Sequence, residues 1–178
     1  YIYAEGEEGL EYALVDALRQ KGLTLATAES CTGGLVSQLV TNVPGASEVF
    51  GFGFVTYANE AKQKLLGVSA AALEQHGAVS HQVAAAMAAG AARAAGADVA
   101  VALTGIAGPG GGTPEKPVGL VYLGAARGGE VFVKRLDLGK RDRATVRLAA
   151  AKNALDAARR LALGLPLPGA VRAEDIPE

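Results

Sequence analysis

Residues 26–34 have the sequence Ala26-Thr27-Ala28-Glu29-Ser30-Cys31-Thr32-Gly33-Gly34, and this stretch predicts the centre of the fold. The apolar run 23–28 that leads into it favours a buried strand. Small, hydroxylated and glycine residues follow, and they favour a sharp turn into a helix. Ser30 would then lie at the mouth of the turn, in a strand–turn–helix unit typical of α/β proteins.

The turn has two interpretations. The backbone N–H groups of Thr32, Gly33 and Gly34 would lie in the first helical turn, unpaired and at the positive end of the helix dipole. An oxyanion or a phosphate is well received there, which makes Ser30 a candidate nucleophile and these three residues candidate substrate-binding residues. The alternative is that Ser30 or Thr32 only caps the helix. The stretch alone leaves both interpretations open.

Length and composition narrow the class of protein. A chain of 178 residues suits one domain with its own core. With five Tyr, four Phe and no Trp, that core must consist mainly of Ala, Val and Leu. The formal charge of −1 argues against nucleic acid as a partner. We find neither a bilayer-spanning segment nor a secretion signal, so we expect a soluble protein without a membrane partner.

Cys31 is the only cysteine, which excludes an intrachain disulfide and a multi-cysteine metal site. A reducing, cytoplasmic location is the simplest expectation. The chain begins at Tyr1 rather than at Met. One interpretation is therefore that it is a piece of a longer protein with a further N-terminal domain.

Hydrophobic periodicity predicts a single three-layer α/β/α domain over residues 1–163, with a mixed sheet that ends in an antiparallel hairpin. Pro166 and Pro168 forbid continuation of the last helix, so residues 164–178 are expected to form a loose tail. The predicted strands are 23–28, 49–57, 98–103, 118–126 and 131–138, and the predicted helices are 10–21, 35–43, 59–66, 69–77, one starting after Ser80, and 141–162.

The first three predicted strands end near Ser30, Tyr57 and Thr104, where polar or glycine-rich residues interrupt the apolar pattern. Ligands of open α/β sheets bind at this edge. The loop 104–113 contains five glycines and can approach a ligand closely, starting with Thr104 and Gly105. It matches neither a P-loop nor a dinucleotide-binding pattern, so we expect no bound nucleotide cofactor of those kinds. A flexible connection between strands is the alternative.

A nucleophilic serine needs a base. Lys62 is the candidate, because burial can lower the pKa of a lysine toward neutrality, and it follows Tyr57 closely in the sequence. Asn59 would lie on the same side of the helix as Lys62. The alternative is an ordinary solvated lysine, which is what we expect of Lys64.

Other residues compete for these roles. His76 or His81 could complete a Ser/His/Asp triad, although neither falls at the predicted strand edge. Cys31 could itself be the nucleophile if the helix N-terminus lowers its pKa. Arg141 follows Gly139 at the predicted start of the last helix, where a guanidinium could pair with a carboxylate or phosphate. Arg143 and Arg147 are its rivals.

Together these stretches resemble the C-terminal domain of the CinA family (competence/damage-inducible protein), which also occurs alone as the nicotinamide-nucleotide amidase. The resemblance covers about residues 10–161. Its motifs are Thr27–Gly34, Tyr57–Lys62, Leu65–Val68, Thr104–Gly111 and Lys116–Gly119. Two features depart from the pattern: Lys140 replaces a usually acidic residue before Arg141, and His81-Gln82 replaces a more common acidic pairing.

The resemblance implies hydrolysis of the carboxamide of nicotinamide mononucleotide to nicotinate mononucleotide and ammonia, without metal or cofactor. Ser30 matches the family's nucleophile, Lys62 and Tyr57 its activating partners, and Thr104 and Arg141 residues that help to hold the substrate. An Ala-rich, well-covered surface also suggests a homo-oligomer. The alternative function is a non-catalytic module that binds a nucleotide or protein and is linked to DNA uptake or repair.

Overall fold

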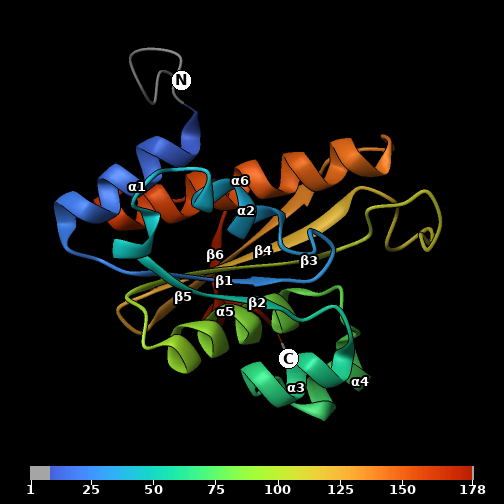
Figure 1. Cartoon of the computed structure of the whole chain (residues 1–178). Coiled ribbons are helices and arrows are strands. Elements are labelled where there is room, and N and C mark those ends of the chain that lie inside the picture. Colours follow the sequence, from blue (N-terminus) through green and yellow to red (C-terminus); the bar gives the residue numbers. More distant parts are fainter. Residues whose placement is uncertain (1–8, 178) are drawn as a thin grey trace.

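The computed structural model describes residues 9–177 and shows a mixed sheet covered by helices on both faces (Figure 1). This is the single three-layer α/β/α domain that the sequence predicts. Its helices are α1 (Leu10–Lys21), α2 (Leu35–Thr41), α3 (Asn59–Leu66), α4 (Ala70–His76), α5 (His81–Ala95) and α6 (Arg143–Leu163). Its strands are β1 (Leu25–Glu29), β2 (Phe50–Val55), β3 (Val99–Gly105), β4 (Leu120–Arg127), β5 (Glu130–Asp137) and β6 (Val171–Arg172), and short 3-10 helices span Ala46–Glu48 and Ala173–Asp175.

The strand order is β2-β1-β3-β4-β5-β6. β1 lies between β2 and β3 and pairs in parallel with both, whereas β4, β5 and β6 continue the sheet in antiparallel fashion. Gly128 and Gly129 form the two-residue turn between β4 and β5, both at positive φ, as the hairpin prediction requires. The carboxyl ends of β1, β2 and β3 therefore meet at one edge of the sheet.

The two faces of the sheet carry different side chains, because successive residues of a strand point to opposite sides. In β1 and β3, Leu25, Val99, Val101 and Leu103 pack into the core under α1, α2 and α6. The alternate positions are alanines, which pack against α3 and α5. Small residues let α5 lie close to the sheet: a Cβ at Gly124 of β4 would collide with the backbone of Ala84 in α5. The core of Ala, Val and Leu expected from composition thus occupies both faces, and the face toward α5 is richer in alanine.

The start of the last helix differs from the sequence prediction. The last helix begins at Arg143 rather than at residue 141, because the side chain of Asp142 accepts a hydrogen bond from Thr145 N and caps the helix. α3 begins at Asn59 as predicted, and its N-cap is Ala58, without a side-chain hydrogen bond.

The C-terminal segment is more ordered than the expected loose tail. Val171 and Arg172 pair with β5, whose edge offers unpaired backbone groups, and the amide of Gln82 donates to Pro177 O. The side chain of Ile176 packs against a small core cluster near β4 and β5. α6 ends at Leu163, before the two prolines, with Gly164 in the left-handed conformation as its C-cap. The strand β6 has only two residues, which is too short for a periodic pattern to be detected in the sequence. None of the helices formed by residues 9–177 combines the length and apolarity needed to cross a membrane.

Candidate active site

Ser30 lies immediately after β1, at the edge where the three parallel strands end. Its backbone N–H donates to Leu103 O of β3 at 2.9 Å, and Thr56 N donates to Glu29 O at 2.9 Å, so both neighbouring strands hold this point of the backbone. The chain then turns sharply: Gly33 N donates to Ser30 O at 3.0 Å, and Gly33 and Gly34 have φ of 59° and 98°. Residues with a Cβ rarely adopt such angles, which explains the two glycines.

Lys62 reaches this serine from α3. Its Nζ lies 3.1 Å from Ser30 Oγ, 2.8 Å from Thr56 O and 3.5 Å from Tyr57 O. Although lysines are almost never fully buried, Lys62 is only 1% exposed. The structure thus brings together the nucleophile and the base that the sequence suggested, while Lys64 is exposed as expected.

The environment of Lys62 disfavours a charge. Burial lowers the pKa of its amine, and no carboxylate within residues 9–177 forms an ion pair with it. A neutral amine has two N–H groups and one lone pair. The carbonyls of Thr56 and Tyr57 can take the two N–H groups, which leaves the lone pair for the hydroxyl of Ser30.

The N-terminus of α2 is already occupied by a side chain of the protein. Glu29 is 1% exposed, and its carboxylate accepts hydrogen bonds from Gly34 N at 3.1 Å, Val36 N at 3.0 Å and Ser37 N at 2.8 Å. We expected free N–H groups at residues 32–34, but Gly33 N and Gly34 N are taken, because the helix begins only at Leu35 and Glu29 reaches under the turn. Among the described residues, the N–H groups of Cys31 and Thr32 donate no hydrogen bond.

Tyr57 contacts the pair only through its backbone. Its side chain is 63% exposed, and its hydroxyl accepts a hydrogen bond from Arg143 Nη2 at 3.2 Å instead of approaching Ser30. Arg143 Nη1 also donates to Gly108 O at 2.8 Å, so this arginine joins β2's end to the glycine loop. Arg141 is exposed, precedes the helix cap and makes no hydrogen bond within the described residues. Asp142, a residue type common at helix N-caps, is the sequence signal that places the start of the helix at Arg143.

Arg147, the other alternative to Arg141 for binding an anion, hydrogen-bonds to the backbone of the turn. Its Nε donates to Cys31 O at 3.2 Å and its Nη2 to Thr32 O at 2.6 Å. These bonds connect α6 to the backbone beside Ser30. The hydroxyl of Thr32 is buried and has no hydrogen-bond partner within the described residues.

The side chains of the remaining candidates make no hydrogen bond to Ser30 Oγ or Lys62 Nζ within the described residues. Thr104 is buried, and its hydroxyl donates to Ala78 O at 2.7 Å. A Cβ on Gly105 would collide with Val121, so close packing of β3 on β4 already requires this glycine. Asn59 is the exposed first residue of α3.

The rival catalytic groups are poorly placed. The ring of His81 packs against Tyr122 with centroids 4.4 Å apart, and the carbonyl of His76 accepts a hydrogen bond from Lys116 Nζ. Neither histidine hydrogen-bonds to Ser30 within the described residues, so the structure shows no Ser/His pair. Burial raises the pKa of the Cys31 thiol to about 11, contrary to the lowering expected at a helix N-terminus. Cys31 therefore stays protonated at neutral pH.

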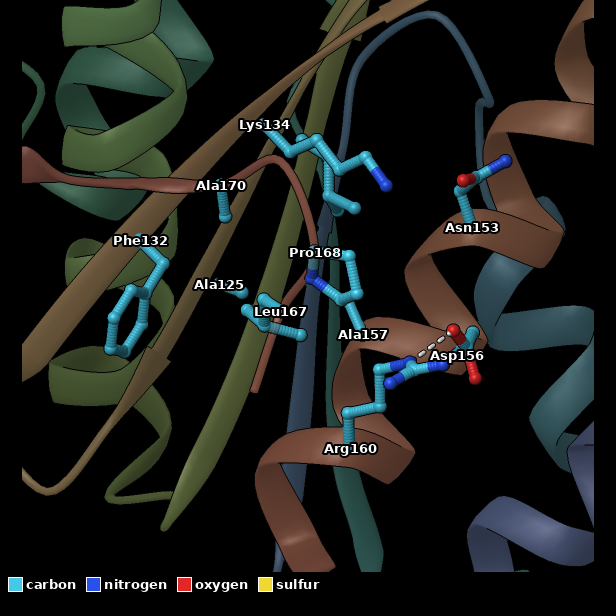
Figure 2. Close-up of a pocket in the computed structure, with 11 residues that line it drawn as sticks. Ala125, Phe132, Lys134, Asn153, Asp156, Ala157, Arg160, Leu167, Pro168 and Ala170 are labelled. Atoms are coloured by element: carbon cyan, nitrogen blue, oxygen red, sulfur yellow. Dashed lines mark hydrogen bonds and ion pairs between the residues drawn. The ribbon is translucent and has the colours of Figure 1, made fainter. Parts of the chain in front are cut away.

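Two hollows lie away from Ser30 and Lys62 and contain neither residue. Figure 2 shows one between α6, the β4–β5 hairpin and the segment that follows α6, with the Asp156–Arg160 ion pair on its wall. A larger hollow of about 650 Å³ lies near Leu23, Asp98 and Arg127, at the opposite edge of the sheet. In residues 9–177 no cluster of three His, Cys, Asp or Glu side chains is arranged to hold a metal ion.

Fold and site together define a three-layer α/β/α domain with a serine–lysine pair at the carboxyl edge of its parallel strands. The family model for the CinA C-terminal domain matches residues 7–162, and the chain belongs to the CinA family. A CinA-like protein of Kosmotoga olearia is 55% identical over 165 residues, which cover 93% of this chain and 40% of that protein. The chain thus spans about 40% of the length of this relative.

Solved structures show the same fold. The competence/damage inducible protein CihA from Agrobacterium tumefaciens is 47% identical, with a TM-score of 0.81 over 83% of this chain and 90% of that one. A competence-damaged protein (CinA) superfamily protein from Escherichia coli is 40% identical, with a TM-score of 0.80 over 86% of this chain and 88% of that one. The likeness found in the sequence motifs therefore extends to the three-dimensional fold.

Proposed function

We propose that this chain is an amidohydrolase that converts nicotinamide mononucleotide to nicotinate mononucleotide and ammonia. The observation that carries the proposal is the buried Lys62 amine, 3.1 Å from Ser30 Oγ and without an acidic partner in the described residues. Burial without an acidic partner is costly for a charged lysine, whereas a general base benefits from the lowered pKa that burial gives. The proposed substrate follows from the family resemblance.

In the proposed reaction, Lys62 Nζ accepts the proton of the Ser30 hydroxyl as Oγ attacks the carboxamide carbon. The tetrahedral intermediate collapses when its C–N bond breaks, and the protonated Lys62 returns the proton to the leaving nitrogen, which departs as ammonia. Water then attacks the ester on Ser30 while Lys62 accepts the water proton. The C–Oγ bond breaks, Lys62 returns that proton to Ser30 Oγ, and the acid leaves as its carboxylate after giving its own proton to solvent.

The negatively charged oxygen of the tetrahedral intermediate needs hydrogen-bond donors to stabilise it. The free N–H groups of Cys31 and Thr32 are the candidates, since those of Gly33 and Gly34 are engaged. One such donor commonly contributes ~3 kcal/mol to stabilising the transition state. For the substrate phosphate, Arg143 is better placed than Arg141, because it stands beside the exposed Tyr57 and the glycine loop.

Ammonia release tests the function. We expect the chain to release ammonia from nicotinamide mononucleotide and to act much more slowly on free nicotinamide, which lacks the phosphate and ribose that bind and orient the carboxamide. Equal concentrations of both compounds are compared in a coupled ammonia assay. A chain that binds the nucleotide by calorimetry but releases no ammonia would instead be the non-catalytic binding module.

Cys31→Ala separates the two nucleophiles. The serine mechanism predicts that this variant keeps its rate of ammonia release within about threefold, because a buried thiol with a pKa of about 11 supplies almost no thiolate at neutral pH. The measurement is the rate at saturating substrate, alongside a thermal melt that reports the small loss of packing. Loss of nearly all activity in a folded variant would favour the cysteine.

A further inference from the structure

Glu29 stands out among buried groups because the proposed chemistry does not use it. It is the last residue of β1, it precedes Ser30 directly, and both carboxylate oxygens face donors. Oε2 accepts from Gly34 N and Val36 N, and Oε1 accepts from the backbone N–H and the hydroxyl of Ser37. We propose that Glu29 is a positioning residue that holds the Ser30 hydroxyl against Lys62. This inference rests on the proposed function.

The carboxylate closes the turn that carries the serine. The first end of the turn is fixed by the bond from Gly33 N to Ser30 O. The other end, where α2 begins, is fixed by the side chain of Glu29, which reaches across the turn and accepts hydrogen bonds from Gly34 N and Val36 N. Residues 30–34 therefore form a loop tied at both ends to the end of β1.

A short hydrogen-bonded chain fixes the carboxylate in turn. The Ser37 hydroxyl donates to Glu29 Oε1 at 2.8 Å and lies 2.8 Å from Thr27 Oγ1. Since the single hydroxyl proton of Ser37 goes to the carboxylate, Thr27 must be the donor to Ser37. Thr27 belongs to β1, so the strand, the helix and the carboxylate form one network.

A carboxylate is needed because every partner is a donor. Glutamine has the same shape but offers one acceptor oxygen, and its NH₂ group would face backbone N–H groups. Leaving buried donors unpaired is costly, so the turn would shift to relieve it. Lys62 belongs to another element, α3, and would not follow this shift. A displacement of about 1 Å can cost on the order of 100-fold in rate.

The first variant to test is Glu29→Gln. We expect kcat for ammonia release to fall about 30- to 100-fold while KM stays within about twofold, because the turn positions the nucleophile. Sulfonylation of Ser30 by phenylmethanesulfonyl fluoride should slow by a similar factor. That reaction forms an Oγ–S bond and expels fluoride, with the serine proton passing to Lys62, so it reports nucleophile geometry without nucleotide binding.

The matched control is Asp98→Asn. Asp98 is a carboxylate that also accepts from a backbone N–H and a hydroxyl, those of Thr24, but at the far end of β1 and β3. It should lower thermal stability while leaving kcat and the sulfonylation rate near wild type. Glu29→Gln with wild-type kcat and wild-type labelling, measured well below its melting temperature, would overturn the positioning role.

Ser37→Ala covers the case in which Glu29→Gln does not fold. It removes one of the four hydrogen bonds to the Glu29 carboxylate, so a loss of roughly threefold to tenfold in kcat and in sulfonylation rate is expected, and an unchanged rate contradicts the proposal.

The positioning role of Glu29 and the proposed amidohydrolase function fail in different ways. If Ser30 is sulfonylated but no ammonia is released, only the substrate assignment fails. If Ser30 is neither sulfonylated nor needed for ammonia release, both proposals fall.

Discussion

Replacing Ser30 with alanine is expected to lower the rate of ammonia release by about 10⁴-fold or more, because the residue that forms the covalent intermediate is lost. The fold should survive. The hydroxyl of Ser30 bonds only to Lys62 among the described residues, and the turn is held by backbone groups and by Glu29. Steady-state kinetics and a thermal melt of the purified variant measure both quantities.

Ser69→Ala is the matched control for this variant. Ser69 caps α4 by accepting a hydrogen bond from Ala72 N, so its loss should cost about 1 kcal/mol of stability and leave turnover unchanged. A Ser30→Ala variant that keeps most of the wild-type activity would remove serine from the mechanism.

Lys62→Met is expected to lower turnover by about 10³-fold, because methionine fills a similar volume but cannot accept the proton of Ser30. Lys64→Met is the control. It changes the same residue type two positions along the same helix, but on the exposed side, and should leave the rate unchanged. Equal losses in both variants would point to the helix rather than to the base.

The lowered pKa of Lys62 also sets a pH dependence. The wild-type rate should rise with pH as the amine loses its proton, with a midpoint below the usual range of lysine. Stability should change in the same direction. Between the lowered pKa of the folded state and the ordinary pKa of the unfolded state, the unfolded chain binds more protons, so the free energy of unfolding rises with pH.

Lys62→Met should remove this contribution, and denaturant titrations across that pH range measure it. An unchanged pH dependence of stability in the variant would mean that Lys62 has an ordinary pKa in the folded state.

Much of the fold could be predicted from local pattern. Each βα unit is indicated by an apolar run, a turn of small residues and then apolar residues at helical spacing. The two glycines at 128–129 predicted the hairpin. The pair of Ser30 and Lys62 could be predicted as well. Both follow strands that end at the same edge of a parallel sheet, so topology alone places them near each other.

Hydrogen bonds that a side chain makes across a turn could not be predicted from the sequence. The carboxylate of Glu29 bonds to groups five, seven and eight residues ahead, across a turn whose shape depends on two left-handed glycines. Helix-capping rules consider neighbours within about one helical turn, so from the sequence alone the N–H group of Gly34 is assigned to a ligand rather than to Glu29. The start of α6 was also predicted incorrectly. The side chain of Asp142 caps the helix, so the helix begins at Arg143 and Arg141 lies before it.

Trapping of the covalent intermediate tests the serine–lysine mechanism most directly. The protein is mixed with nicotinamide mononucleotide, quenched in acid, digested and examined by mass spectrometry. The account predicts an ester of nicotinate mononucleotide on the peptide that contains residues 30 and 31, located on Ser30 and absent from Ser30→Ala. An adduct on Cys31, or steady ammonia release from Ser30→Ala with no adduct at all, would contradict it.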